Sequence, residues 1–89
     1  MKKKRGVLDG AFTSDPCTMT CPCGKPVHYM LKGNIRLIPG GHKCKFRNMQ
    51  QDVVRTIRAE ESAGINVTKG EAARRINSIL WLKPEDLND

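Results

Sequence analysis

The chain has 89 residues, of which 38% are hydrophobic and 4% aromatic, and its formal net charge is +7. A chain of this size forms one domain with a thin aliphatic core, so we expect a metal, a disulfide or a partner to add stability. No stretch is long and apolar enough to span a bilayer, and the basic N-terminus is not followed by the apolar core of a signal peptide. We therefore expect a cytoplasmic protein with no membrane contact, whose thiols stay reduced.

The charge is divided unevenly along the chain. Residues 1–47 hold ten Lys and Arg against two Asp and Glu, whereas residues 48–89 hold six against seven. A strongly basic half attracts polyanions, nucleic acid first among them, although a merely solvated surface has the same composition. The slightly acidic second half is more natural for a protein that binds other proteins.

Residues 1–16 are predicted to form a basic, flexible tail. They begin with Lys2-Lys3-Lys4-Arg5 and continue through scattered Gly, Ser and Pro with little periodicity. Such a segment buries too little apolar surface to offset the entropy lost on ordering.

Residues 17–47 contain all four cysteines and form the predicted metal-binding unit. The pattern is Cys17-x-x-x-Cys21-x-Cys23, followed after a hairpin-length segment by His42-x-Cys44. Thiolates and an imidazole at these spacings are typical of tetrahedral Zn²⁺ sites, and the absence of an export signal argues against disulfides. We predict Cys21, Cys23 and Cys44 as ligands with His42 as the fourth, and Cys17 remains the alternative fourth ligand.

The segment Cys21-Pro22-Cys23-Gly24-Lys25 resembles the knuckle of zinc-ribbon proteins, with one spacer residue fewer. The resemblance covers five residues and implies metal binding only. His28, five residues beyond Cys23, would lie about 16 Å from it in an extended chain, so we predict a structural or exposed role for this histidine.

A β-hairpin is predicted from two apolar runs, residues 27–31 and 35–38, separated by Lys32-Gly33-Asn34. Folding the chain about the Lys32–Gly33 peptide places Cys21 opposite Cys44 and Cys23 opposite His42. Since residues i and i+2 of an extended strand point the same way, both pairs are expected to converge on one ion.

Residues 48–84 are predicted to form a two-helix hairpin packed on the metal unit. The first helix should cover 48–63, with Asn48 as N-cap and Gly64 as its stop. The second should cover 69–82, with Thr68 as N-cap and Trp81 in the core, and residues 85–89 form an acidic tail. The fold class is thus small α+β, with a zinc-stabilised hairpin followed by two short helices and flexible ends.

No catalytic motif is evident. The chain has neither the His-Glu-x-x-His nor the Pro-Cys-x-x-Cys pattern of zinc hydrolases and deaminases, and it has no glycine-rich phosphate loop. We therefore expect a non-enzymatic, basic zinc-binding regulator that binds nucleic acid, with duplex DNA favoured over RNA because exposed aromatic residues for base stacking are scarce. The alternative is an adaptor or inhibitor that covers an acidic protein surface on a larger nucleic-acid machine such as a polymerase or nuclease. The residues expected to contact nucleic acid or that partner are Lys25, Lys32, Arg36, Lys43, Lys45 and Arg47.

Overall fold

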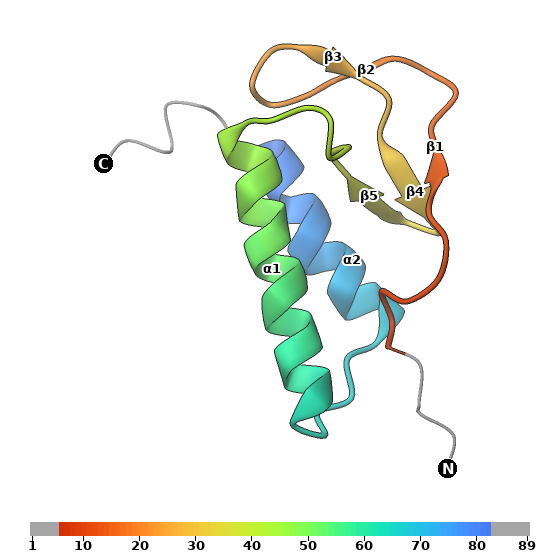
Figure 1. The fold of residues 1–89 in the computed structure, drawn as a ribbon, viewed down its shortest axis with the longest axis vertical. Helices are drawn as coiled ribbons and strands as arrows, with labels where there is room; N and C mark the ends of the chain where they lie inside the picture. Colours follow the sequence, from red (N-terminus) through yellow and green to blue (C-terminus); the bar gives the residue numbers. More distant parts are fainter. Residues whose placement is uncertain (1–5, 83–89) are drawn as a thin grey trace.

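The computed structural model describes residues 6–82, which form a small α+β arrangement of two antiparallel sheets and two helices (Figure 1). None of the helices in this part of the chain is long and apolar enough to cross a membrane. The elements in chain order are β1 (Thr13–Ser14), β2 (Met19–Thr20), β3 (Pro26–Val27), β4 (Met30–Lys32), β5 (Ile35–Leu37), α1 (Lys45–Ser62), α2 (Lys69–Asn77) and the 3₁₀ helix η1 (Ser78–Trp81).

The strands form two separate hairpins rather than one. In the larger sheet the order is β1-β4-β5, and Lys32 pairs with Ile35 across a two-residue turn, Gly33-Asn34. Gly33 has a φ of +59°, a conformation that glycine adopts without steric cost and that suits tight hairpin turns. The smaller sheet pairs β2 with β3, and its connection carries the Cys21–Lys25 knuckle.

Residues 6–16 depart from the predicted tail, because they belong to the folded domain. Leu8 is buried among residues of α1 and α2, and the backbone amide of Val7 donates a 2.8 Å hydrogen bond to Glu61 Oε2. Thr13 pairs with Leu31 to add β1 to the larger sheet. Only a few separate side chains of this segment pack against the core, so its sequence shows no hydrophobic periodicity. The KKKR run lies outside the described residues.

Both helices begin or end differently from their predicted bounds. Helix α1 begins at Lys45, three residues earlier than expected, because Cys44 rather than Asn48 is its N-cap. Thr68 caps α2 as predicted, and its Oγ1 accepts a hydrogen bond from the Glu71 amide. The continuous helix expected over 69–82 instead changes to η1 at Ser78, and the prediction that Trp81 lies in the core is wrong, since its side chain is 74% exposed. The acidic tail at 85–89 lies outside the described residues.

Two apolar clusters hold the layers together. The first lies between the helices, β5 and the N-terminal segment, and it comprises Leu8, Ile35, Val54, Ile57, Val67, Ala72, Ala73 and Ile76. The second comprises Cys21, Val27, Tyr29, Ile38, Phe46 and Ile79. Because it includes Cys21 and lies against Cys23 and Cys44, this second cluster positions the candidate site described next.

Candidate metal centre

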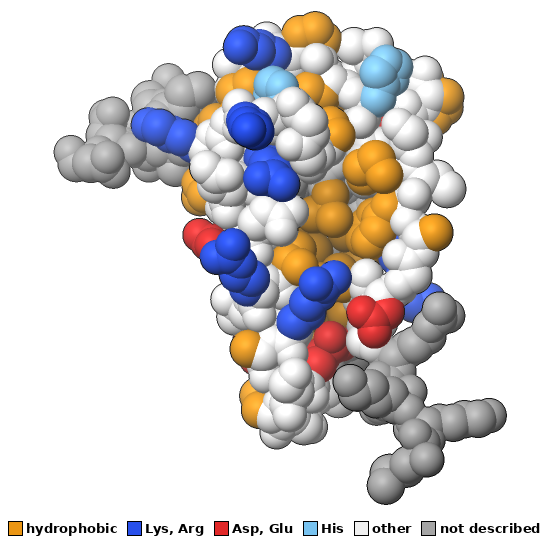
Figure 2. Space-filling model, viewed as in Figure 1, with side chains coloured by type: hydrophobic (Ala, Val, Ile, Leu, Met, Phe, Trp, Pro, Cys, Tyr) orange, Lys and Arg blue, Asp and Glu red, His pale blue; other side chains and the backbone are white. Residues whose placement is uncertain are grey.

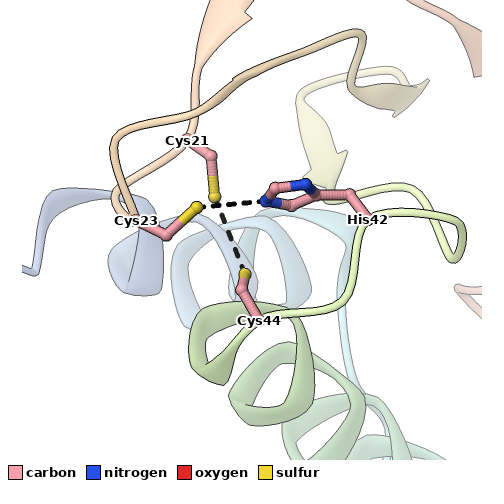
Figure 3. A group of neighbouring side chains, drawn as sticks. All are labelled: Cys21, Cys23, His42 and Cys44. Carbon is pink, nitrogen blue, oxygen red and sulfur yellow. Dashed lines mark hydrogen bonds between the residues drawn. The ribbon is translucent and has the colours of Figure 1, made fainter.

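Four side chains from two distant segments converge at the end of the molecule where α1 begins (Figure 3). One ligand atom from each of Cys21, Cys23, His42 and Cys44 lies within 4.8 Å of all the others. The Cys21 and Cys44 sulfurs are 3.8 Å apart, and Cys23 Sγ is 3.1 Å from His42 Nε2. These four residues lie close enough to hold a metal ion.

The first two thiols are presented by a tight turn. The Gly24 amide donates to the Cys21 carbonyl at 2.8 Å, and the Cys21 amide donates to the Lys25 carbonyl at 2.9 Å. Gly24 has a φ of +97°, which a side chain at this position would disfavour. The turn therefore places Cys21 and Cys23 on the same side of the chain, two residues apart.

The other two ligand residues come from the loop that leads into α1. His42 is placed by a turn in which its amide donates to the Pro39 carbonyl at 3.0 Å. Cys44 is extended, with a φ of −161°, and its Sγ accepts a 3.4 Å hydrogen bond from the Arg47 amide as the N-cap of α1. The positive end of the helix dipole therefore lies at this sulfur.

The two knuckle cysteines differ in their electrostatic surroundings. Cys21 is 1% exposed, and its burial, together with the neighbouring Cys44 thiol, raises its pKa to about 12. Burial also acts to raise the pKa of Cys23, but hydrogen bonds from the Lys25 backbone and the His42 ring outweigh it and lower that pKa to about 7. A buried thiol beside a second sulfur becomes a thiolate most readily when a cation replaces its proton.

The Cys21–Cys44 separation and the donor set suit a metal ion. Metal–sulfur bonds of about 2.3 Å in a tetrahedron place two sulfurs about 3.8 Å apart, which is the Cys21–Cys44 separation. Three sulfurs and one imidazole nitrogen are soft and borderline donors. Such donors bind late transition metals better than they bind magnesium or calcium.

Cys17 and His28 lie outside this cluster. Cys17 is exposed and is not among the residues whose ligand atoms converge, so the structure brings His42 rather than Cys17 to the other three. His28 is exposed on the smaller hairpin side of the molecule, with Nδ1 3.0 Å from the Asp15 carbonyl and Nε2 3.4 Å from Thr18 Oγ1.

The pairing expected within the cluster is present, but a single hairpin does not produce it. The turn of β4 and β5 is centred on the Gly33–Asn34 peptide, one residue later than predicted. Cys21 and Cys23 belong to the separate turn between β2 and β3, whereas His42 and Cys44 lie beyond β5. Proximity therefore comes from packing of the smaller hairpin over the start of α1, which strand spacing alone does not reveal.

Three of the six predicted basic contact residues surround the candidate metal centre. Lys25 follows Cys23 by two residues, Lys43 lies between His42 and Cys44, and Lys45 is the first residue of α1. All three side chains are exposed. On the face seen in Figure 2, several Lys and Arg side chains lie in the upper part, where Figure 1 places the start of α1, and others lie over the middle of the molecule. We call Lys25, Lys43 and Lys45 the lysine rim.

The other three predicted contact residues are placed differently. Arg47 is half-buried, and its Nε has no hydrogen-bond partner within residues 6–82. Lys32 ends β4 beside the Gly33-Asn34 turn, and its Nζ lies 5.7 Å from the centroid of the Phe12 ring. Arg36 is exposed in a separate groove beside η1. The expected single basic face is therefore divided.

The helix arginines are largely paired with acids. Arg75 contacts Glu60 at 2.8 Å and Glu71 at 2.7 Å, and Arg74 also pairs with Glu71. The hydrogen bonds from Arg75 and Arg74 hold the pKa of the Glu71 carboxyl below its usual value. These pairs lie where α1 ends and α2 begins, away from the lysine rim.

No family model, curated protein or solved structure matches the chain. The zinc-ribbon resemblance therefore rests on the Cys21–Lys25 segment alone.

Proposed function

We propose that this protein is a small zinc-stabilised module that binds nucleic acid and catalyses no reaction. Zinc is the ion that three thiolates and one imidazole hold most often as a closed structural site. The support lies in the convergence of Cys21, Cys23, His42 and Cys44 and in the match of the sulfur separation to a tetrahedral ion.

A structural role for the ion follows from the number of protein ligands. Four protein donors fill a tetrahedral shell and leave no position for the water or substrate that a catalytic zinc needs. The acids nearest to the four residues in sequence, Asp15 and Asp52, have other partners, since Asp15 accepts a hydrogen bond from the Cys17 amide and Asp52 pairs with Arg55. We therefore assign the ion to stability.

The lysine rim is the observation that carries the binding proposal. Lys25, Lys43 and Lys45 are exposed around a centre that a bound ion would make rigid, and rigid cations suit the phosphate backbone. Arg74 and Arg75 of α2 are paired with acids, whereas the lysine rim forms no ion pair within residues 6–82. Duplex DNA is the favoured ligand, because phosphate contacts from lysines need no splayed bases.

The test is the salt dependence of binding. Zinc-loaded protein should bind a random DNA duplex at low ionic strength, with a log–log salt slope of about −3 to −5 if three to five phosphates are neutralised. An absence of salt-sensitive binding to DNA or RNA would contradict the proposal. A stoichiometric protein partner captured from nuclease-treated lysate would then favour a protein-binding adaptor.

A further inference from the structure

A groove beside η1 is lined by residues that do not belong to the lysine rim. It has a volume of about 460 Å³, within the range of about 300–1,000 Å³ found for small-ligand sites. Its walls come from β2, β4, the Gly33-Asn34 turn and η1. Trp81 lines it and is 74% exposed, one of two large hydrophobic side chains that reach solvent within residues 6–82.

The groove is preformed by hydrogen bonds between its walls. The Asn77 side chain accepts a 2.9 Å hydrogen bond from the Arg36 amide and donates one of 2.6 Å to the Asn34 carbonyl. On the opposite side the Tyr29 hydroxyl donates to the Thr20 carbonyl at 3.0 Å. The end of α2 is thus tied to the β4–β5 turn, and little ordering is needed on binding.

The charge of the groove is complementary to an anion. Arg36 is exposed and lines the groove, and it forms no ion pair within the described part of the chain. Within residues 6–82, no acidic side chain lines the groove. A cation beside an exposed indole is the combination that binds a flat, apolar ring attached to a negative charge.

We propose that this groove binds one unpaired nucleotide, with the Trp81 indole stacked on the base and the Arg36 guanidinium on its phosphate. The inference rests on the proposed nucleic-acid binding and extends it to single-stranded segments. Neighbouring polar groups, the Thr20 hydroxyl and the Asn34 amide, suit the edges of a base, whereas an acidic peptide would leave the indole face with no matched ring.

The experiment uses the emission of Trp81, which is the single tryptophan of the chain. Zinc-loaded protein is titrated with a fluorescently labelled oligothymidine and with a labelled duplex, and anisotropy and tryptophan emission are followed together. We expect saturable quenching with the oligothymidine. Trp81→Leu should weaken its binding about five- to hundredfold, the usual effect of losing one stacked base, with little change for the duplex. Trp81→Phe should retain part of the affinity.

Two matched variants complete the design. Arg36→Gln should flatten the oligothymidine salt slope by about 0.7, the value for one phosphate contact on a single strand. Ile65→Ala, at the other exposed hydrophobic side chain, should change neither ligand's affinity.

The outcomes separate the two proposals. Salt-sensitive duplex binding without any change in Trp81 emission, and with equal oligothymidine affinity in Trp81→Leu, overturns the groove assignment and leaves the proposed function standing. Absence of binding to both nucleic acids overturns both proposals. If polyglutamate quenches Trp81 and displaces the oligothymidine at equal charge concentration, the groove is an acidic-peptide site and the nucleotide assignment is wrong.

Discussion

The side chain of Gln50 accepts a 2.8 Å hydrogen bond from the backbone amide of Ile38, deep inside the protein. Its amide nitrogen donates to the Arg36 carbonyl at 2.9 Å and to the Ile76 carbonyl at 3.3 Å. One buried polar residue on α1 therefore joins the end of β5 to α2. It supplies side-chain partners for the Ile38 amide and the Arg36 carbonyl at the end of β5, and it adds a second donor to the Ile76 carbonyl.

We expect Gln50→Leu to lower the free energy of unfolding by about 2–4 kcal/mol, because the Ile38 amide and the Arg36 carbonyl lose their side-chain partner. Chemical denaturation of the zinc-loaded protein measures this change. Gln51→Leu, at the half-buried neighbour, is the control and should have a much smaller effect. Equal stabilities of the two variants would show that the Gln50 network contributes little.

The protein should bind one Zn²⁺ per chain, and chelation should unfold it. In a domain with so thin a core, the free energy of metal binding contributes directly to folding. Elemental analysis gives the stoichiometry, and circular dichroism during titration with a chelator gives the coupling. A metal-free sample with an unchanged cooperative melt would contradict this expectation.

Cys21→Ser should abolish stoichiometric zinc binding and folding, whereas Cys17→Ser should preserve both. The two cysteines are four residues apart, but only Cys21 belongs to the converging set. His42→Ala should resemble Cys21→Ser, and His28→Ala should resemble Cys17→Ser. The ¹¹³Cd chemical shift of a cadmium-substituted sample counts the sulfur ligands, and a four-sulfur value would mean that Cys17 displaces His42.

Replacing the three residues of the lysine rim with glutamine should flatten the duplex-DNA salt slope by up to about three units, roughly one for each phosphate that is no longer neutralised. Glutamine at Lys25, Lys43 and Lys45 should not disturb the fold, because all three side chains are exposed. The matched control replaces three exposed arginines on the helices, Arg55, Arg58 and Arg74. A larger effect from the control would place the interface on the helices.

Leu8→Ala should destabilise the protein by about 2–4 kcal/mol, since a buried leucine is truncated inside the first apolar cluster. Thermal unfolding of the zinc-loaded protein is the measurement. Ile65→Ala removes a comparable side chain that is half-exposed, and it should cost far less. If Leu8→Ala were neutral, residues 6–16 would contribute nothing to stability, as the predicted tail implies.

Local signals in the sequence were sufficient for several elements. The Thr68 cap and the hairpin turn at Lys32-Gly33-Asn34 depend on residues within three or four positions. Both are present in the structure, although the turn is centred one residue later than predicted. The four residues Cys21, Cys23, His42 and Cys44 were also predictable as a set from residue type and spacing, although the packing that brings the two pairs together was not.

Features that depend on distant packing were not predictable. Leu8 is buried only because α1 and α2 supply a surface for it, and no periodic neighbour marks it. Asn48 was a plausible cap, but Cys44, a candidate ligand, is the N-cap instead, and α1 therefore begins earlier. Trp81 lies five residues after Ile76, off the buried stripe of its helix, and this spacing was the signal that favoured exposure over the core.

The second apolar cluster makes the metal-binding segment hard to separate from the rest of the chain. Tyr29 and Ile38 from the cysteine half pack with Phe46 of α1 and Ile79 of η1, directly beneath Cys21. A peptide of residues 17–47 would contain every candidate ligand yet lack Ile79, and Phe46 would have no helix to hold it. Transplanting that peptide into another scaffold should yield a chelating loop without a defined shape. The candidate metal centre and the C-terminal helices therefore depend on the same apolar cluster, and a variant that loses one is expected to lose the other.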